Sequence, residues 1–286
     1  ALKKHARRMP ADCRGNIASN PGLALGASIG EQAKLGRDKL TVLLPAPLAP
    51  LGPWIEQLVA ESTGKEGRGI LPIVDEPFED VEQYGPDRAF VAVLTSQSVD
   101  VSSTALSLER AGKALFRIQT SADQLGGEFF RWEFATAVAG VVLRVNPFDE
   151  PDVRNAKERT KAQLAAFEKT GALSPDPPLS RAASYHRRES RPRDPLGSQG
   201  RYVAILDYRP ADLVRRPTMA LLRRDIRRMA PLATTHGIGP RYLHSTGQYH
   251  KGGPNTGLFL MLTSPDASST PVPGTRYTVS ILKSGQ

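Results

Sequence analysis

The chain has 286 residues, which is long enough for about two domains and a sizeable hydrophobic core. Lys and Arg together number 38 and Asp and Glu 29, so the net charge is +9, and 40% of the residues are hydrophobic. This composition excludes an acidic disordered tail and a fibrous protein. The positive charge favours anionic partners such as phosphorylated metabolites.

Cys13 is the one cysteine of the sequence, which excludes an intrachain disulfide and a thiolate metal cluster. A reducing compartment is the natural location of such a chain, so we expect a cytoplasmic protein. The most apolar stretch, residues 40–60, contains four prolines and Glu56, which is incompatible with a membrane-spanning helix. The first residues lack the apolar core of a secretory signal and begin with Ala, so we expect a processed protein or a fragment.

Much of the positive charge lies in two runs, residues 2–14 and residues 181–193. A terminal run and a run within a proline-rich stretch are typical of a solvated arm and a solvated linker. A nucleic-acid surface is the alternative, but only 6% of the residues are aromatic and no stacking motif interleaves with the charges. We therefore expect no nucleic-acid partner.

Helices and strands alternate along the first 170 residues. Asn20 followed by Pro21 is typical of a capped helix start, and Gly36 is a suitable end for that helix. We expect further helices over residues 53–61, 104–111, 128–144 and 151–169, and extended segments over residues 40–44, 69–74, 89–94 and 114–118. The alternation predicts an α/β fold with a parallel sheet covered by helices on both faces.

The composition changes near residue 171. Residues 171–200 contain five prolines among Ser and Arg and have no apolar periodicity, which indicates a linker or mobile loop. A strand over residues 201–207, an Arg-rich helix over 219–229 and a buried strand over 257–263 follow, either as a small second α/β unit or as a completion of the first sheet. We divide the chain into a basic N-terminal arm (1–19), an α/β domain (20–170), a linker (171–200) and a C-terminal α/β segment (201–286).

Three segments are richer in Gly, charge and His than core packing requires. Residues 61–69 lie between a helix and a strand but lack the spacing of a phosphate-binding loop, and Glu61 by itself is typical of an exposed helix end. Residues 146–151 form a proline-framed turn before a helix that contains Lys157. Residues 242–257 combine two histidines, a lysine, hydroxyls and four glycines, which suits a polar ligand.

The histidines also suggest two other chemistries. A zinc site could use His236, His244 and His250, but their spacing fits no familiar zinc motif and no cysteine assists, so we expect no metal. A Ser-His-Asp hydrolase is disfavoured because the Gly-x-Ser-x-Gly elbow is missing.

Several longer stretches carry a resemblance that covers nearly all of residues 20–165 and 201–282, in order. They are Asn20-Pro-Gly-Leu23, Gly36-Arg-Asp-Lys-Leu-Thr41, Trp54-Ile-Glu-Gln-Leu-Val-Ala-Glu-Ser-Thr-Gly-Lys-Glu-Gly67, Glu128-Phe-Phe-Arg-Trp-Glu-Phe-Ala-Thr-Ala-Val-Ala-Gly140, Asn146-Pro-Phe-Asp149, Gly239-Pro-Arg-Tyr-Leu-His-Ser-Thr-Gly-Gln248 and His250-Lys-Gly-Gly-Pro-Asn-Thr-Gly257. With these stretches the chain resembles the phosphoglucose isomerase family, in the form that is fused behind a transaldolase in some bacteria.

The resemblance implies a second sugar-isomerase domain, a three-layer α/β/α sandwich with a mainly parallel sheet. It also implies interconversion of glucose 6-phosphate and fructose 6-phosphate through a cis-enediolate. Glu61 matches the family's base, which moves a proton between C2 and C1, and Lys157 and His244 match residues that assist ring opening. Such chemistry needs a carboxylate with a raised pKa and an acid and base near the ring oxygen.

The resemblance further implies substrate contacts from Lys65, Gln248 and Lys251, no cofactor, and a homodimer. The family's first sugar-isomerase domain and the transaldolase barrel have no counterpart in these 286 residues, so the resemblance leads us to expect the C-terminal part of a fused protein. Glu150 stands where the family has Gln, which adds a negative charge where a phosphate ester must approach.

A second interpretation belongs to a different functional class. A non-catalytic domain that binds sugar phosphates would keep the fold without the half of the family's protein that grips the phosphate. Substitution of Glu61 distinguishes the two interpretations, because it abolishes turnover in an isomerase and leaves ligand binding in a binding domain.

Overall fold

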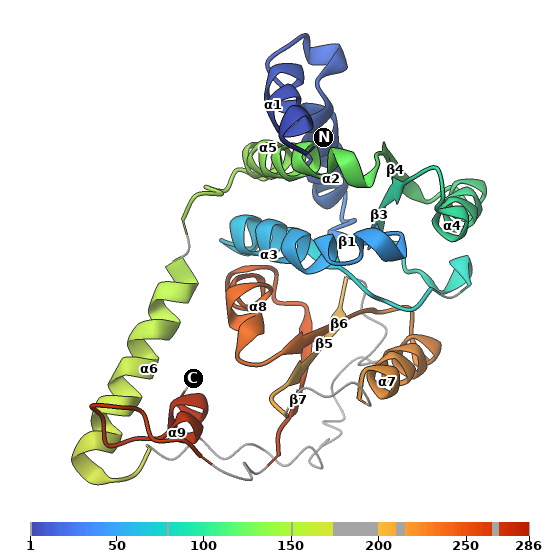
Figure 1. Ribbon diagram of the computed structural model, residues 1–286. Coiled ribbons are helices and arrows are strands. Elements are labelled where there is room, and N and C mark those ends of the chain that lie inside the picture. The colour runs from blue at the N-terminus through green and yellow to red at the C-terminus, as the bar shows by residue number, and fades with distance from the viewer. Residues whose placement is uncertain are drawn as a thin grey trace.

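Two parallel sheets organise the chain in the computed structural model, which describes residues 2–78, 80–149, 151–173, 200–209, 215–264 and 269–285 (Figure 1). The first sheet has the strand order β2-β1-β3-β4, and all of its neighbouring strands are parallel. Its strands are β1 (Lys39–Leu43), β2 (Leu71–Ile73), β3 (Arg88–Leu94) and β4 (Ala114–Gln119). Helix α2 (Pro21–Lys34) precedes β1, α3 (Leu51–Thr63) lies between β1 and β2, α4 (Val99–Arg110) lies between β3 and β4, and α5 (Leu125–Leu143) follows β4.

Strand β3 is buried on both faces, as its apolar sequence predicts. Ala89, Val91 and Val93 belong to the main core, which also contains residues of α2, α3 and α5. The opposite face of the strand, which includes Ala92, packs against α4. The expected three-layer α/β/α sandwich is thereby confirmed.

Helix α2 begins and packs as its sequence indicates. The side chain of Asn20 caps it by accepting a hydrogen bond from the Leu23 amide at 2.8 Å, with Pro21 at the first position. Gly26 lets α2 approach α5 closely, because a Cβ atom there would lie 2.3 Å from the carbonyl oxygen of Ala135. A larger residue would therefore push the two helices apart.

The second sheet has the order β6-β5-β7, again all parallel. It is built from β5 (Tyr202–Asp207), β6 (Ala233–Ile238) and β7 (Gly257–Leu262), and α7 (Arg215–Met229) packs on it. Two short helical segments, η5 (Arg241–His244) and α8 (Gly247–Gly252), connect β6 to β7, and α9 (Val279–Ser284) lies near the C-terminus. The small C-terminal α/β segment that we expected is thus a sheet of its own.

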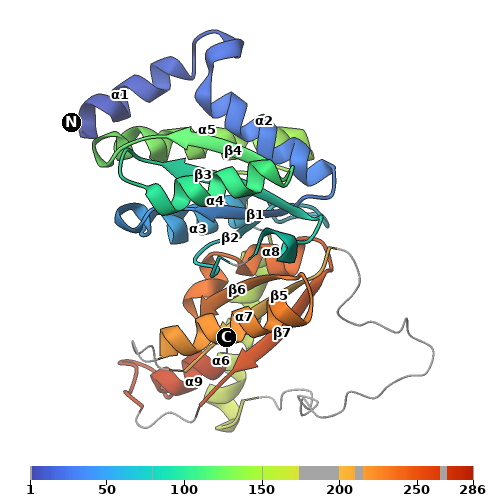
Figure 2. The ribbon, with the colours of Figure 1, turned by 90° about the vertical axis from the view of Figure 1, so that its right-hand side faces the viewer.

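The two sheets share one apolar cluster where their edges meet. Ala60, Leu71 and Ile73 of the first unit pack with Tyr202 and Tyr249 of the second. Strands β2 and β6 contact each other, and Figure 2 shows the two units stacked along this junction. The junction holds the two halves as one packed body.

A buried ion cluster reinforces the junction. Glu76, which follows β2, has a fully enclosed carboxylate that pairs with Arg88 and lies 3.8 Å from Nη1 of Arg227. Its Oε1 also accepts hydrogen bonds from the amide and the hydroxyl of Thr234, both at 2.9 Å. Arg223 donates to the carbonyl oxygens that precede Glu76 and to Thr234. One carboxylate therefore connects residues from both units.

Several elements differ from the sequence-based expectations. Residues 2–12, which we expected as a solvated arm, form helix α1 (Leu2–Asp12), which packs along α5 with Met9 near Gly127. Helix α4 begins five residues earlier than expected, at Val99. Residues 233–238 form strand β6 although their Thr, His and Gly content is not typical of a buried strand. Helix α6 (Pro151–Thr170) confirms the polar helix, whereas residues 174–199 of the expected linker lie outside the described part of the chain.

None of the helices described by the structure is both long enough and apolar enough to cross a lipid bilayer.

Candidate active site

One face of helix α3 packs against the second unit. The helix leads into the segment of residues 61–69, which the sequence predicts to be part of the site. Glu56, Ala60 and Gly64 recur at intervals of four residues and so lie along one side of the helix. Ala60 packs against Tyr242 and Tyr249. The helix end is therefore fixed against the segment of the second unit that contains the His- and Gly-rich residues.

Glu61 lies in the last turn of α3, one residue past that contact face. Its side chain is half-buried, and its Oε2 accepts a hydrogen bond from Nε2 of Gln57 at 3.3 Å. Gln57 precedes Glu61 by one helical turn and is exposed. The predicted base thus lies half-buried in the last turn of a helix at the junction, and a neighbouring amide donates to its carboxylate.

Two hydrogen bonds join the backbone of the loop after Glu61 directly to α8. The side chain of Gln248 is fully buried and donates from Nε2 to the carbonyl oxygen of Gly64 at 2.9 Å. The amide of Gly67 donates to the carbonyl oxygen of Gly252 at 2.8 Å. The structure therefore gives Gln248 a structural contact, and its predicted contact with substrate stays a prediction.

Lys65 fastens a second predicted segment to the same loop. Its side chain is enclosed, and its Nζ donates to the carbonyl oxygen of Asn146 at 2.6 Å, to the carbonyl oxygen of Asp149, and to the Asp149 carboxylate at 2.7 Å. The hydrogen bond from Lys65 holds the pKa of the Asp149 carboxyl below its ordinary value. The ammonium of Lys65 is thereby engaged by the 146–149 turn, and its predicted role in substrate binding is untested.

Lys157 and His244 lie on elements that meet at α8. Lys157 is exposed in the second turn of α6, and His244 is exposed at the end of η5. Helix α8 contacts both α3 and α6, and Figure 1 shows the end of α3, the start of α6 and α8 on the same side of the molecule. Lys251 is exposed within α8 itself. The elements that carry the predicted residues thus all contact or form one short helix, although Glu61 and Lys157 are 96 positions apart in the sequence. Glu150 lies outside the described residues.

The three histidines of the zinc hypothesis have different surroundings. Nε2 of His236 lies 3.4 Å from the Asp207 carboxylate, and Nδ1 of His250 lies 2.8 Å from the Tyr202 hydroxyl. Burial lowers the pKa of His250 to about 3, so its ring is neutral. Within the ranges that the structure describes, no three His, Cys, Asp or Glu side chains are grouped closely enough to hold a metal.

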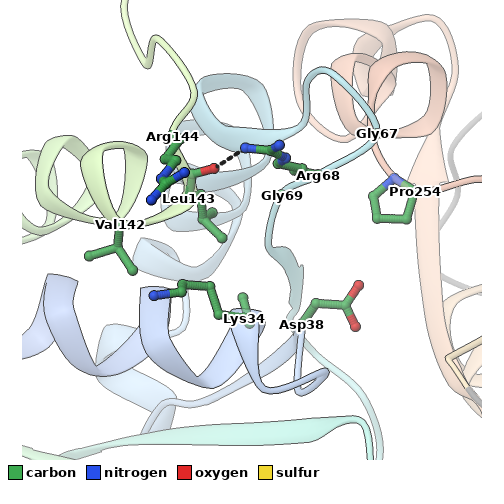
Figure 3. Close-up of a pocket in the computed structure, with 10 residues that line it drawn as sticks. Lys34, Asp38, Gly67, Arg68, Gly69, Val142, Leu143, Arg144 and Pro254 are labelled. Atoms are coloured by element: carbon green, nitrogen blue, oxygen red, sulfur yellow. Dashed lines mark hydrogen bonds between the residues drawn. The ribbon is translucent and has the colours of Figure 1, made fainter.

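A cavity of about 370 Å³ opens beside the loop that follows Glu61 (Figure 3). Lys34, Asp38, Arg68 and Arg144 line it, together with backbone of residues 67–69 and 142–144 and with Pro254 of the second unit. Arg68 donates from Nη1 to the carbonyl oxygen of Leu143 at 2.9 Å. Helices α2 and α5 both end at the cavity, so the partial negative charge of each helix dipole lies there. The basic side chains that line the cavity complement this negative charge.

Sequence reasoning missed Glu56, a strongly perturbed carboxylate of the junction. The residue is 9% exposed, and burial raises its pKa to about 7, although the nearby Ser245 side chain and the positive charges of Arg241 and Arg223 act in the opposite direction. A detectable signal was present, since Glu56 shares a helical face with Gly52, Val59 and other buried positions of α3. The sequence alone could not show which groups cover that face.

Comparison with known proteins gives distant similarity to one enzyme. The chain is 28% identical over 150 residues to the glucose-6-phosphate isomerases of two strains of Leptospira biflexa serovar Patoc, which involves 39% of this chain. The chain spans a third of the length of these curated relatives. No family model matches the sequence.

A solved structure supports the fold alone. The crystal structure of a hypothetical protein from Thermus thermophilus superposes with a TM-score of 0.51 and 19% sequence identity, covering 57% of this chain and 50% of the other. The described chain is therefore an α/β protein with distant similarity to glucose-6-phosphate isomerase over part of its length.

Proposed function

We propose that the chain contributes to an aldose–ketose isomerase that interconverts glucose 6-phosphate and fructose 6-phosphate. The observation that supports it most is that α8 contacts α3, η5 and α6, the three elements that carry Glu61, His244 and Lys157. The distant similarity to glucose-6-phosphate isomerase supports the same reaction class. The upstream sugar-isomerase domain, the transaldolase barrel and a second copy of the chain are proposed partners.

In the proposed reaction Glu61 is the base. Its carboxylate takes the proton from C2 of open-chain glucose 6-phosphate, the C2–H electron pair forms the C1–C2 double bond of the enediolate, and the carbonyl oxygen at C1 becomes negatively charged. The O2 hydroxyl then gives up its proton while O1 gains one, the carbonyl forms at C2, and the electron pair of the C1–C2 double bond takes the proton back from the carboxyl group at C1. His244 and Lys157 exchange protons with the ring oxygen and the O1 hydroxyl during ring opening.

A coupled assay tests the proposal. The purified chain is given fructose 6-phosphate, and the glucose 6-phosphate formed is followed through a dehydrogenase that reduces a nicotinamide cofactor. We expect turnover by the wild type and a loss of about 10²- to 10⁴-fold in Glu61→Gln, because a positioned general base contributes that much. Glu82→Gln, which changes an exposed carboxylate that has no role in the proposed reaction, is the matched control and keeps the wild-type rate.

Calorimetric titration with fructose 6-phosphate separates the isomerase from the sugar-phosphate binding domain. Binding by a folded wild type without turnover supports the binding domain. If the wild type shows neither binding nor turnover, both functions are refuted for this chain by itself. Equal rates in the wild type and in Glu61→Gln refute the role of Glu61.

A further inference from the structure

The cavity beside the loop that follows Glu61 has no part in the proposed reaction (Figure 3). Its volume of about 370 Å³ falls within the range of small-molecule sites, roughly 300 to 1,000 Å³. Glu61, Lys157 and His244 do not line it. Its walls come from the ends of α2 and α5, from the 67–69 loop and from Pro254 of the second unit. A ligand in this cavity would therefore contact both units of the chain.

Three cationic side chains line the cavity, and they come from three different segments. Lys34 is at the end of α2, Arg68 is in the loop before β2, and Arg144 follows the last residue of α5. Lys34 is paired with Glu31 at 3.0 Å. The guanidinium of Arg68 donates to a neutral acceptor, the carbonyl oxygen of Leu143, at 2.9 Å. In the described part of the chain, no carboxylate forms an ion pair with Arg68 or Arg144.

The negative groups at the cavity offset only part of these two guanidinium charges. Asp38 also lines the cavity, but its carboxylate accepts a hydrogen bond from the Lys39 ammonium at 2.7 Å and another from the Tyr249 hydroxyl at 3.2 Å. The ends of α2 and α5 contribute roughly half a negative charge each, which makes about one negative charge in total. A positive excess remains, so the cavity attracts an anion.

The lining side chains indicate which kind of anion fits. A guanidinium group is a planar fork of donors that matches the oxygens of phosphate and carboxylate groups. Figure 3 shows the guanidinium of Arg68 directed toward the end of α5, where Arg144 lies. Two forks can share the three terminal oxygens of a phosphate monoester, whereas a carboxylate offers only two oxygens. The carbon part of such a ligand suits the apolar part of the wall, which consists of Ala33, Val142, Leu143 and Pro254.

We propose that this cavity is a binding site for a phosphate monoester of a small metabolite, held by Arg68 and Arg144. The inference goes beyond the proposed function and does not depend on it. A ligand bound there bridges the end of α5 and the 67–69 loop. That loop is joined to the second unit by the hydrogen bond from the Gly67 amide to the carbonyl oxygen of Gly252 at 2.8 Å. Because the ligand binds the folded state, it raises the melting temperature of the chain.

An NMR titration with glycerol 3-phosphate tests the site directly, because the probe combines a phosphate monoester with a short carbon skeleton. With isotope-labelled arginine side chains, we expect the Nε–H signals of Arg68 and Arg144 to shift as the probe is added. Arg144→Gln weakens binding about tenfold or more, because a hydrogen bond to a charged group is lost. The double variant Arg68→Gln/Arg144→Gln abolishes binding. Arg110→Gln, which changes an exposed arginine at the end of α4, is the matched control and binds as the wild type does.

Thermal melts provide a second readout of the same site. The melting temperature of the wild type rises with the concentration of glycerol 3-phosphate, and that of Arg144→Gln rises less at the same concentration. Without the probe the two proteins melt within a few degrees of each other, because Arg144 is exposed. Glycerol, which lacks the phosphate, causes neither the NMR shift nor the rise in melting temperature.

The outcomes separate this inference from the proposed function. An inactive wild type that binds the probe overturns only the proposed function, whereas Glu61→Gln is expected to bind the probe as the wild type does. The inference is overturned if about 10 mM probe causes no shift, since a site with a Kd of about 1 mM would then be nearly filled. Equal affinities in the wild type and the double variant also overturn it, as does binding that is lost in Glu61→Gln and kept in the double variant. Glycerate that binds as tightly as glycerol 3-phosphate overturns the assignment to phosphate monoesters.

Discussion

Substitution of Glu76 by Gln tests how much the buried ion cluster holds the two units together. Glu76 is the carboxylate that faces three buried arginines, and the change removes its charge with almost no change in volume. Arg88 and Arg227 are 2% exposed and Arg223 is 5% exposed, so none of them can regain hydration without opening the junction. The hydrogen bonds that Oε1 accepts from Thr234 are retained by the glutamine oxygen in one orientation only.

Removing one partner from a buried ion pair costs about 3 to 5 kcal/mol, because the opposite charge remains enclosed. For a chain of this size such a loss lowers the melting temperature by roughly 10 °C. Burial by itself would raise the pKa of Glu76, but Arg88, Arg227 and Arg223 more than reverse that effect and hold it below the ordinary value. A carboxyl with a lowered folded pKa stabilises the fold above the unfolded pKa, and this contribution is lost as the pH falls through the folded value.

Urea and thermal unfolding at pH 7 measure the difference between wild type, Glu76→Gln and the exposed control Glu82→Gln. We expect a large loss for the first variant and a change within about 0.5 kcal/mol for the second. The gap between wild type and Glu76→Gln narrows below the ordinary carboxyl pKa, because protonation then makes the wild type resemble the variant. A difference below about 1 kcal/mol at pH 7 would refute the view that this carboxylate compensates the buried arginines.

Two further substitutions address the loop that follows Glu61. Gly64→Ala places a Cβ atom 2.4 Å from Cα of Tyr249, so we expect a loss of about 1 to 3 kcal/mol in urea unfolding. Gly15→Ala, where the nearest atom is 3.5 Å away, is the control, and equal losses at the two sites would contradict the close contact. Lys65→Met leaves the carbonyl oxygens of the 146–149 turn without their donor, so we expect a loss of about 1 to 3 kcal/mol and faster hydrogen exchange at that turn. The exposed Lys34→Met should change stability by less than about 1 kcal/mol, and an unchanged turn in Lys65→Met would show that the lysine is not its anchor.

The chemistry of the proposed site depends on contacts between segments far apart in the sequence. Lys65 binds a turn more than 80 residues away, and Gln248 binds Gly64 across 184 residues. Lys65 and Gln248, for which the resemblance predicts substrate contacts, thus also have structural partners in distant segments. Helix α8 likewise contacts α3, η5 and α6, which are the elements that carry Glu61, His244 and Lys157.

Elements with local signals could be predicted from the amino-acid sequence. The Asn20 cap and Pro21 fix the start of α2, and the apolar run of β3 fixes a strand buried on both faces. Such signals depend on hydrogen bonds and side-chain periodicity within a few residues, so they can be read along the chain. The alternation of these elements was also sufficient for the fold class.

Only the tertiary structure decided where charges are buried and which polar residues join the two units. Strand β6 has few apolar residues and exists because β5 and the junction cover it, and α1 forms because α5 offers it a packing surface. The side chains of Glu56, Lys65 and Glu76 are buried because residues from distant segments of the chain cover them. Burial and electrostatic compensation depend on the whole folded environment, so a linear pattern of residue types does not contain them.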